Sequence, residues 1–174
     1  RYNLGTITAE KASSETPVVF EEGFETAETG WTATPGMTER IDPAAHSGQG
    51  ALLVTGTQSG DAWSYALFYP KQPILPASRY RLSCWMKVDS IEPATKAPYL
   101  KIGLTDSQGK WLTNFSTNPY DTTKLGTWQQ LTGFVETPAN TAGGHFAIEK
   151  GSLESKMTVT LRLDDVRLEL LESP

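Results

Sequence analysis

Short runs in which apolar and polar residues alternate one by one constrain the fold of this chain more than any other feature. The longest run places five apolar residues on one parity: Tyr80, Leu82, Cys84, Met86 and Val88. Residues 99–105 and 157–163 show the same alternation. Successive side chains of a strand point to opposite faces, so each run predicts a strand with one buried face. No stretch of helical length shows helical apolar spacing without a breaker. These patterns predict antiparallel sheets packed face to face.

Gly, Pro, Asn and Asp separate the expected strands from Val18 onward. Those strands are 18–20 leading into 24–25, 31–34, 38–41, 51–55, 64–69, 79–88, 99–105, 111–116, 127–135, 144–150, 157–163 and 166–170. The apolar parity slips between the last two, which requires a bulge or bend at Asp164-Asp165. We therefore predict an all-β single domain, an antiparallel β-sandwich of the jelly-roll type, over 18–174. Residues 1–17 are expected to be a linker or lead-in strand.

Charge and composition exclude several classes of partner. The net charge is −5 and the sequence pI is about 5.1, without a Lys/Arg cluster, which argues against nucleic acid and anionic membranes as partners. The single cysteine, Cys84, excludes an internal disulfide and lies on the apolar parity of its strand. Neither a transmembrane run nor a signal peptide is present, and the chain starts at Arg1, so we expect a piece of a larger or processed protein.

The sequence offers little for catalysis. Its two histidines are His46 and His145, and it contains no Gly-x-Ser-x-Gly elbow, His-Glu-x-x-His motif or glycine-rich phosphate loop. The acidic pairs 21–22 and 164–165 are adjacent, so on strands their side chains point to opposite faces and do not flank a glycosidic bond. These observations favour a binding module over an enzyme. A jelly-roll polysaccharide lyase would need a His, Tyr or Lys cluster in a groove, with His145 as its obvious member.

Aromatic residues suggest a binding surface. The apolar faces of sugars stack on Trp and Tyr rings, and residues 61–69 and 111–115 are rich in such rings. Trp31 and Trp128 are expected to pack in the core or under turns. Trp85 has polar neighbours on its own parity, so it either lines a cleft or packs under a loop. Lys101, Asn114 and Gln130 are candidate hydrogen-bonding groups.

The order of four motifs resembles the jelly-roll carbohydrate-binding modules appended to bacterial xylanases and other polysaccharide-active enzymes. The motifs are Glu22-Gly23-Phe24-Glu25 followed by Gly30-Trp31, the turn and strand 45–54 with Ser47-Gly48-Gln49-Gly50, the long strand 80–88, and Leu161-Arg162-Leu163-Asp164-Asp165-Val166. Together they span residues 20 to 170. The resemblance implies a non-catalytic module that targets a secreted, bacterial enzyme to its polysaccharide or oligosaccharide, with a covalently linked catalytic domain. The alternative is a protein-interaction or adhesion domain.

The resemblance also implies two sites. It places Trp63, Trp111, His145 and Glu149 at the glycan. Their aromatic side chains make Tyr65, Trp85 and Tyr99 further candidate contacts. A structural calcium ion would bind the carbonyls of Gly23, Ser47 and Gly50 and the carboxylates of Glu25 and Asp164. Calcium prefers six to eight oxygen ligands, and the first and last strands of this fold lie side by side, so the two carboxylates are expected to converge. The opposing interpretation is that Glu25 and Asp164 are solvated strand-end carboxylates.

Overall fold

A computed structural model describes residues 16–174, so the expectation for 1–17 falls almost entirely outside the described residues. The described part forms eleven strands and one short 3-10 helix, η1, over Thr122–Lys124. The strands are β1 (Val18–Glu22), β2 (Thr32–Ala33), β3 (Met37–Asp42), β4 (Ala51–Gln58), β5 (Ser64–Phe68), β6 (Arg79–Glu92), β7 (Tyr99–Thr105), β8 (Trp111–Ser116), β9 (Trp128–Glu136), β10 (Gly143–Glu149) and β11 (Met157–Glu172). None of the helices in this part of the chain is long and apolar enough to span a membrane.

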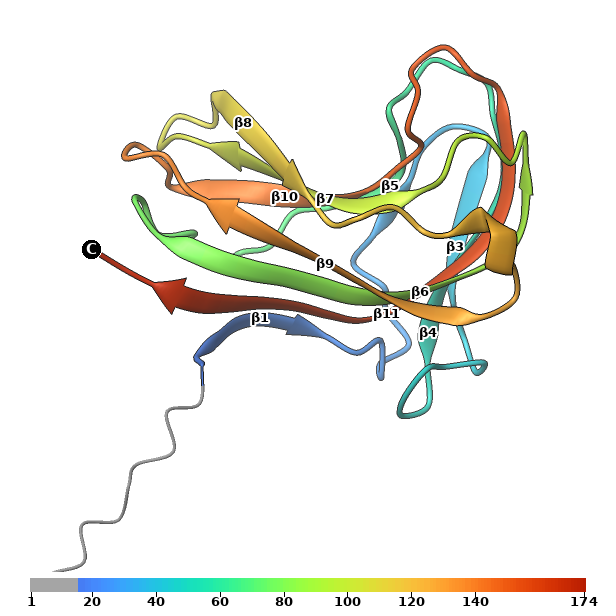
Figure 1. The fold of residues 1–174 in the computed structure, drawn as a ribbon, viewed down its shortest axis with the longest axis horizontal. Coiled ribbons are helices and arrows are strands. Elements are labelled where there is room, and N and C mark those ends of the chain that lie inside the picture. Colours follow the sequence, from blue (N-terminus) through green and yellow to red (C-terminus); the bar gives the residue numbers. More distant parts are fainter. Residues whose placement is uncertain (1–15) are drawn as a thin grey trace, which may run out of the picture.

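The strands form two antiparallel sheets that pack as a sandwich (Figure 1). The first sheet has the order β3-β4-β11-β6-β9, and β1 also pairs with β11. The second sheet has the order β2-β5-β10-β7-β8. The predicted fold class is confirmed, and most strand bounds differ from the expected ones only at strand ends. The expected strand segment 24–25 is wrong: β1 ends at Glu22, and Phe24 has a positive φ of 56°, which a strand does not adopt.

β11 joins two expected strands into one. Its first half, Met157–Leu163, pairs with β4, and its second half, 166–169, pairs with β1. The register with β6 shifts between Asp164 and Arg167, and Asp165 has a positive φ of 47°. The predicted irregularity at Asp164-Asp165 is therefore confirmed as a bulge. It lets both halves of the strand present their apolar residues to the same core.

The core fills the space between the two sheets. Leu82, Cys84 and Met86 of β6 are fully buried and face Leu100, Ile102 and Leu104 of β7 through that core. Burial raises the pKa of the Cys84 thiol above its ordinary range, so the residue is an inert core side chain, as its parity predicts. Trp31 is also buried in this core, as expected.

A polar network crosses the outer face of the first sheet. The guanidinium of Arg162 on β11 donates to Asp42 at the end of β3, with an Nε–Oδ2 distance of 2.9 Å, and also pairs with Asp89 on β6. The hydrogen bond from Arg162 holds the pKa of Asp42 below its usual range, against the opposing effect of burial. The network therefore links three strands and favours the ionised form of Asp42.

We predict that Arg162→Met lowers the free energy of unfolding by about 1–3 kcal/mol at neutral pH, because two carboxylates lose their charged donor. A lowered pKa stabilises the folded state above the unfolded value, and this contribution is lost as pH falls through the folded value. The difference in Tm between wild type and variant should therefore shrink between neutral pH and about pH 3.

Arg40→Met is the matched control, since Arg40 pairs with the same Asp42 at 3.1 Å but is exposed. It should cost at most about 1 kcal/mol. Equal losses from the two variants, or a pH-independent difference for Arg162→Met, would contradict this role of Arg162.

Candidate functional site

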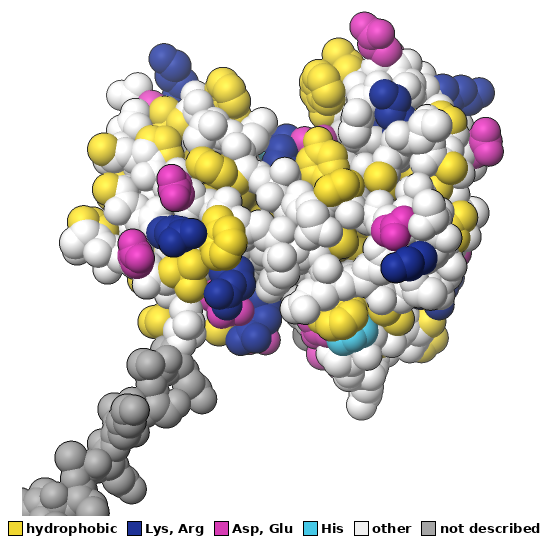
Figure 2. Space-filling view, viewed as in Figure 1, with side chains coloured by type: hydrophobic (Ala, Val, Ile, Leu, Met, Phe, Trp, Pro, Cys, Tyr) yellow, Lys and Arg dark blue, Asp and Glu magenta, His cyan; other side chains and the backbone are white. Residues whose placement is uncertain are grey.

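A hollow of about 290 Å³ opens on the outer face of the second sheet. We call it the groove. It is lined by Trp63, Tyr99, Lys101, Asn114, Phe115, Ser116 and Glu149. Figure 2 shows a deep notch between two lobes, with hydrophobic side chains on its walls and basic and acidic side chains at its base. The groove thus combines aromatic walls with a charged floor.

An ion pair forms the floor of the groove. Lys101 on β7 contacts Glu149 on β10 through Nζ and Oε1, and their side chains are only 14% and 5% exposed. Ser64 on β5 donates to the same carboxylate at 3.3 Å. Burial, followed by the charge of Glu149, raises the pKa of Tyr99, so its hydroxyl stays protonated at neutral pH. A ligand in the groove therefore meets an ion pair that is already held in place, beside the protonated hydroxyl of Tyr99.

Trp63 stands on the wall of the groove with 57% of its surface exposed, because a buried lysine fixes the loop that carries it. The Lys150 backbone N–H donates to the Trp63 carbonyl at 2.7 Å. Its fully buried ammonium donates to Gln58 Oε1 at 2.6 Å and to the Leu153 carbonyl at 3.2 Å. Gln58 Oε1 in turn accepts the N–H of Gly60 at 2.9 Å.

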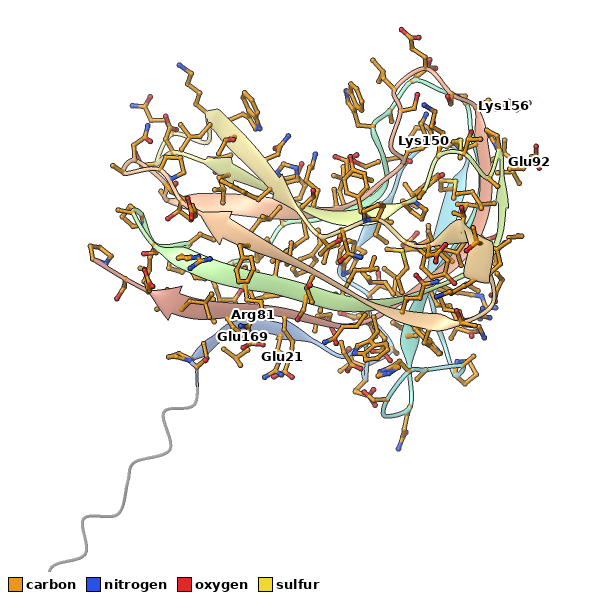
Figure 3. The ribbon with its side chains drawn as sticks, viewed as in Figure 1. Glu21, Arg81, Glu92, Lys150, Lys156 and Glu169 are labelled. Atoms are coloured by element: carbon orange, nitrogen blue, oxygen red, sulfur yellow. The ribbon has the colours of Figure 1, made fainter. Side chains whose placement is uncertain are left out.

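Burial lowers the pKa of the Lys150 ammonium, and the negative charge of Asp61 opposes this shift. Figure 3 labels Lys150, which directly follows the end of β10.

The opposite wall comes from β8. Trp111 is 58% exposed and does not line the groove itself. Its indole N–H donates to Asn114 Oδ1 at 2.8 Å, and Asn114 does line the groove. The register between β7 and β8 shifts at Leu104/Thr105. Because of this shift, Trp111 lies on the outer face of the sheet, whereas Phe115 packs against the core. The structure therefore places Trp111 beside the groove, where it orients Asn114.

His145 lies on the same face of β10 as Glu149 but four residues along the strand. Its ring occupies the space above Gly103, where any side chain would collide with it, and it stacks on Tyr69 with a centroid distance of 5.4 Å. Burial, followed by the charge of Lys101, lowers the pKa of His145, so the ring is neutral at neutral pH. Tyr69 is 68% exposed. The two rings extend the aromatic surface beyond the groove.

Two sequence-predicted contacts lie elsewhere. Tyr65 is fully buried in the core, because the β5–β10 register slips around it and turns it inward with Ala66. Trp85 belongs to the first sheet and points away from the core on the far side of the sandwich. Neither residue reaches the groove. The expected contacts Trp63, Tyr99 and Glu149 do line it.

The two carboxylates expected at a calcium site approach the same loop. Asp164 is fully buried and accepts from the backbone N–H of His46 at 2.8 Å and of Ser47 at 3.1 Å. Glu25 accepts from the Gln49 N–H at 2.8 Å. Burial raises the pKa of Asp164 despite these bonds. Residues 16–174 contain no group of three His, Cys, Asp or Glu side chains that would hold a metal.

Two glycines of the 46–50 loop lie very close to the segment that follows β1. A side chain at Gly48 would collide with the Glu25 carboxylate, and one at Gly50 would collide with the Phe24 carbonyl. Of the neighbouring acids, Glu22 points elsewhere and accepts the Phe24 N–H at 2.7 Å. Asp165 contacts the same loop, through the His46 ring at 2.8 Å and the Ser47 hydroxyl at 2.8 Å. Hard oxygen donors from both ends of the chain thus gather at one loop, a donor set of the kind calcium takes.

The sequence profile of the family CBM_4_9, described as a carbohydrate binding domain, matches residues 16–158. No curated protein sequence shows significant similarity to this chain.

Several solved structures share the fold. A CBM22 xylan-binding domain from Paenibacillus barcinonensis has a TM-score of 0.69 at 16% identity, covering 94% of this chain and 100% of that domain. The CBM22 and GH10 modules of an endo-1,4-beta-D-xylanase from Clostridium thermocellum, complexed with xylohexaose, have a TM-score of 0.70 at 16% identity, covering 90% of this chain and 29% of that one. A C-terminal family 22 carbohydrate binding module from the same organism has a TM-score of 0.56 at 16% identity, with 88% and 94% covered.

The burial of Tyr65 generates a prediction about stability. Its hydroxyl is buried and has no hydrogen-bond partner among the described residues, which costs free energy in the folded state. We predict that Tyr65→Phe leaves the free energy of unfolding unchanged or raises it by up to about 1–3 kcal/mol, measured by urea denaturation. Tyr80→Phe is the matched control and should destabilise, since the Tyr80 hydroxyl accepts the Leu75 N–H at 2.8 Å. Destabilisation by Tyr65→Phe of equal size would contradict the unpaired state of that hydroxyl.

Proposed function

Since this chain belongs to the CBM_4_9 family of carbohydrate-binding domains, we propose that its groove holds a stretch of polysaccharide and that xylan is the first ligand to test. The groove itself supports the sugar: an exposed indole on its wall stands beside a charged, hydrogen-bonding floor. Sugar rings present apolar C–H faces to aromatic rings and hydroxyls to polar groups, so both features are used at once. One structural neighbour is a xylan-binding domain and another is a xylanase complexed with xylohexaose, which supports xylan over other polysaccharides.

The single observation that carries the proposal is that Trp63 and the Lys101–Glu149 pair line the same groove. The ammonium of Lys101 is a donor only, whereas the carboxylate of Glu149 is an acceptor only. A sugar hydroxyl both donates and accepts, so vicinal hydroxyls suit adjacent groups of opposite kind. Because the pair is nearly buried before the ligand arrives, little side-chain ordering remains to oppose binding.

The surface along β10 supports an extended ligand. His145 and Glu149 are four residues apart on one face, which corresponds to about 13 Å along a strand. Exposed rings lie at both ends of this interval, Trp63 at one and Tyr69 stacked on His145 at the other. Such spacing suits several consecutive sugar units better than a single monosaccharide.

We propose further that the module serves a secreted, bacterial polysaccharide-active enzyme to which it is covalently attached. One neighbour combines a module of this fold with a GH10 module in the same chain. Tethering raises the local concentration of catalytic domain at the polymer surface without adding any chemistry of its own. The net charge of −5 favours neutral glycans over strongly anionic ones in this role.

Binding to xylan should depend on Trp63. We predict that Trp63→Ala weakens binding to soluble xylan at least about tenfold, or ~1.4 kcal/mol, in calorimetry or affinity electrophoresis, because the ring face is lost. Leu125→Ala is the control, since Leu125 is 41% exposed but follows η1 and does not line the groove, and it should change the affinity less than about twofold. Absence of binding by the folded wild type to xylan and to a panel of other polysaccharides would contradict a sugar-binding function and favour a protein-interaction domain.

We also propose that a structural calcium ion binds where Glu25 and Asp164 meet the 46–50 loop. The carboxylates of Glu25 and Asp164 would hold it, together with the carbonyls of Gly23, Ser47 and Gly50. Two carboxylates from distant parts of the chain already contact this one loop, which supports the proposal. The ion would neutralise the buried charge of Asp164 and join the segment after β1 to β11 and the 46–50 loop.

Calcium should therefore stabilise the fold. We predict a higher Tm in calcium than in EDTA, equivalent to about 2.7 kcal/mol when calcium exceeds its dissociation constant about a hundredfold. Glu25→Gln should abolish most of this difference, while Glu28→Gln, an exposed neighbour, should keep it. Identical melting curves in calcium and EDTA would overturn the calcium site while leaving the groove unaffected.

A further inference from the structure

A second hollow, of about 320 Å³, opens on the outer face of the first sheet. We call it the outer hollow. It is lined by Glu21, Arg81, Ser83, Trp85, Gln130, Thr132, Asp165, Arg167 and Glu169, from strands β1, β6, β9 and β11. Figure 3 labels Glu21, Arg81 and Glu169 together on this face. The residues that alternate with them on β6, Leu82 and Cys84, are buried in the core, so the outer hollow lies on the opposite side of the sandwich from the groove.

The aromatic side chain of the outer hollow is fixed. The Trp85 ring stacks on His46 with a centroid distance of 3.8 Å and an interplanar angle of 14°. His46 is itself bonded to Asp165 through Nδ1 at 2.8 Å. Trp128 meets the edge of the same imidazole at 5.6 Å. Trp85 is thus a held ring whose indole still lines an open hollow, and it has no role in the groove.

The polar side chains of the outer hollow are close to one another without being joined. Arg81 lies 3.8 Å from Glu169, and Arg167 lies 3.8 Å from Glu169 and 3.7 Å from Glu21. These distances exceed the roughly 3.2 Å of a good hydrogen bond. The Nε of Arg167, the atom nearest Glu21, is buried and has no hydrogen-bond partner among the described residues. Donors and acceptors therefore stand opposite each other with unused hydrogen-bonding capacity.

We propose that the outer hollow is a second glycan-binding site, which takes uncharged sugar units against Trp85. The inference rests on the proposed function for its class of ligand, but not for its residues, none of which lines the groove. A sugar hydroxyl donates to a carboxylate and accepts from a guanidinium, so it bridges a pair such as Arg81 and Glu169 that is too far apart to bond directly.

Charge selects the uncharged ligand. Two guanidinium groups face three carboxylates in the outer hollow, so its formal charge is slightly negative. An anionic sugar would meet Glu21, Asp165 and Glu169, whereas a cation would meet both arginines. A neutral, hydroxyl-rich ligand forms hydrogen bonds with both kinds of group and adds no charge that would go unpaired. Trp85 and Arg81 are four residues apart on β6, about 13 Å, which gives room for a short oligosaccharide.

Two sites on opposite faces would give the module a property that the groove alone does not supply. A single copy would contact two polysaccharide chains, or two stretches of one chain, and the second contact would form at high effective concentration. Binding to insoluble xylan would then exceed what the affinity of the groove for a soluble oligosaccharide predicts.

The test is an NMR titration of the full chain, labelled with nitrogen-15, with xylohexaose in the Trp63→Ala background. The readouts are the indole N–H of Trp85 and the Nε–H signals of Arg81 and Arg167. Thr132→Trp fills the outer hollow from an exposed position. Thr158→Trp adds the same ring to an exposed position of β11 outside the outer hollow and serves as the control.

We expect the signals on the outer face to shift in a saturable way when xylohexaose is added to Trp63→Ala. The added Thr158→Trp substitution should leave these shifts and the affinity they report unchanged. The added Thr132→Trp substitution should weaken the affinity at least about tenfold. Absence of shifts on this face, while the wild type binds xylohexaose through the groove, would overturn the second site and leave the proposed function standing. Equal weakening by both Trp insertions would also overturn it. No binding of xylohexaose or any polysaccharide by the wild type would overturn both proposals together.

Discussion

Asp164 lies where β11 changes its partner from β4 to β1, and its buried carboxylate accepts the backbone N–H groups of His46, Ser47 and Asp165. This one group ties the bulge in the longest strand to the loop before β4. Asp164 thereby holds the bulge that lets both halves of β11 present their apolar residues to the same core. The register of the first sheet follows from that bulge, because β6 and β1 both align on the second half of β11.

A rigid sandwich leaves two outer faces whose side chains are free to bind. On the second sheet, the floor of the groove comes from Lys101 and Glu149, which stand on central strands and need no loop to position them. The exposed wall is different, since Trp63 stands on a loop and depends on the buried ammonium of Lys150. The polar groups proposed to bind the sugar thus stand on strands, and the loop that carries Trp63 is anchored to the buried Lys150.

Period-two alternation predicts the sandwich, most of its strands and the bulge, because burying one face of each strand dominates the energetics of a sandwich. It does not predict the left-handed conformation of Phe24, which ends β1. It failed at Tyr65, where an extra residue in β5 turns a side chain inward that regular alternation would place outside. It also identified Trp85 as outward-facing without indicating which sheet carries the groove, since that depends on how the strands are ordered. Lys150 gave no sequence signal, because a buried ammonium paired with an amide and a carbonyl resembles any surface lysine in sequence.

The central claim is that the outer face of the second sheet is where this domain binds polysaccharide. A crystal structure of the chain with bound xylohexaose tests it most directly. We predict a sugar ring stacked on Trp63, with hydroxyls bonded to Lys101 and Glu149. An oligosaccharide bound only elsewhere on the surface, with Trp63 and the Lys101–Glu149 pair free of contact, would contradict the claim.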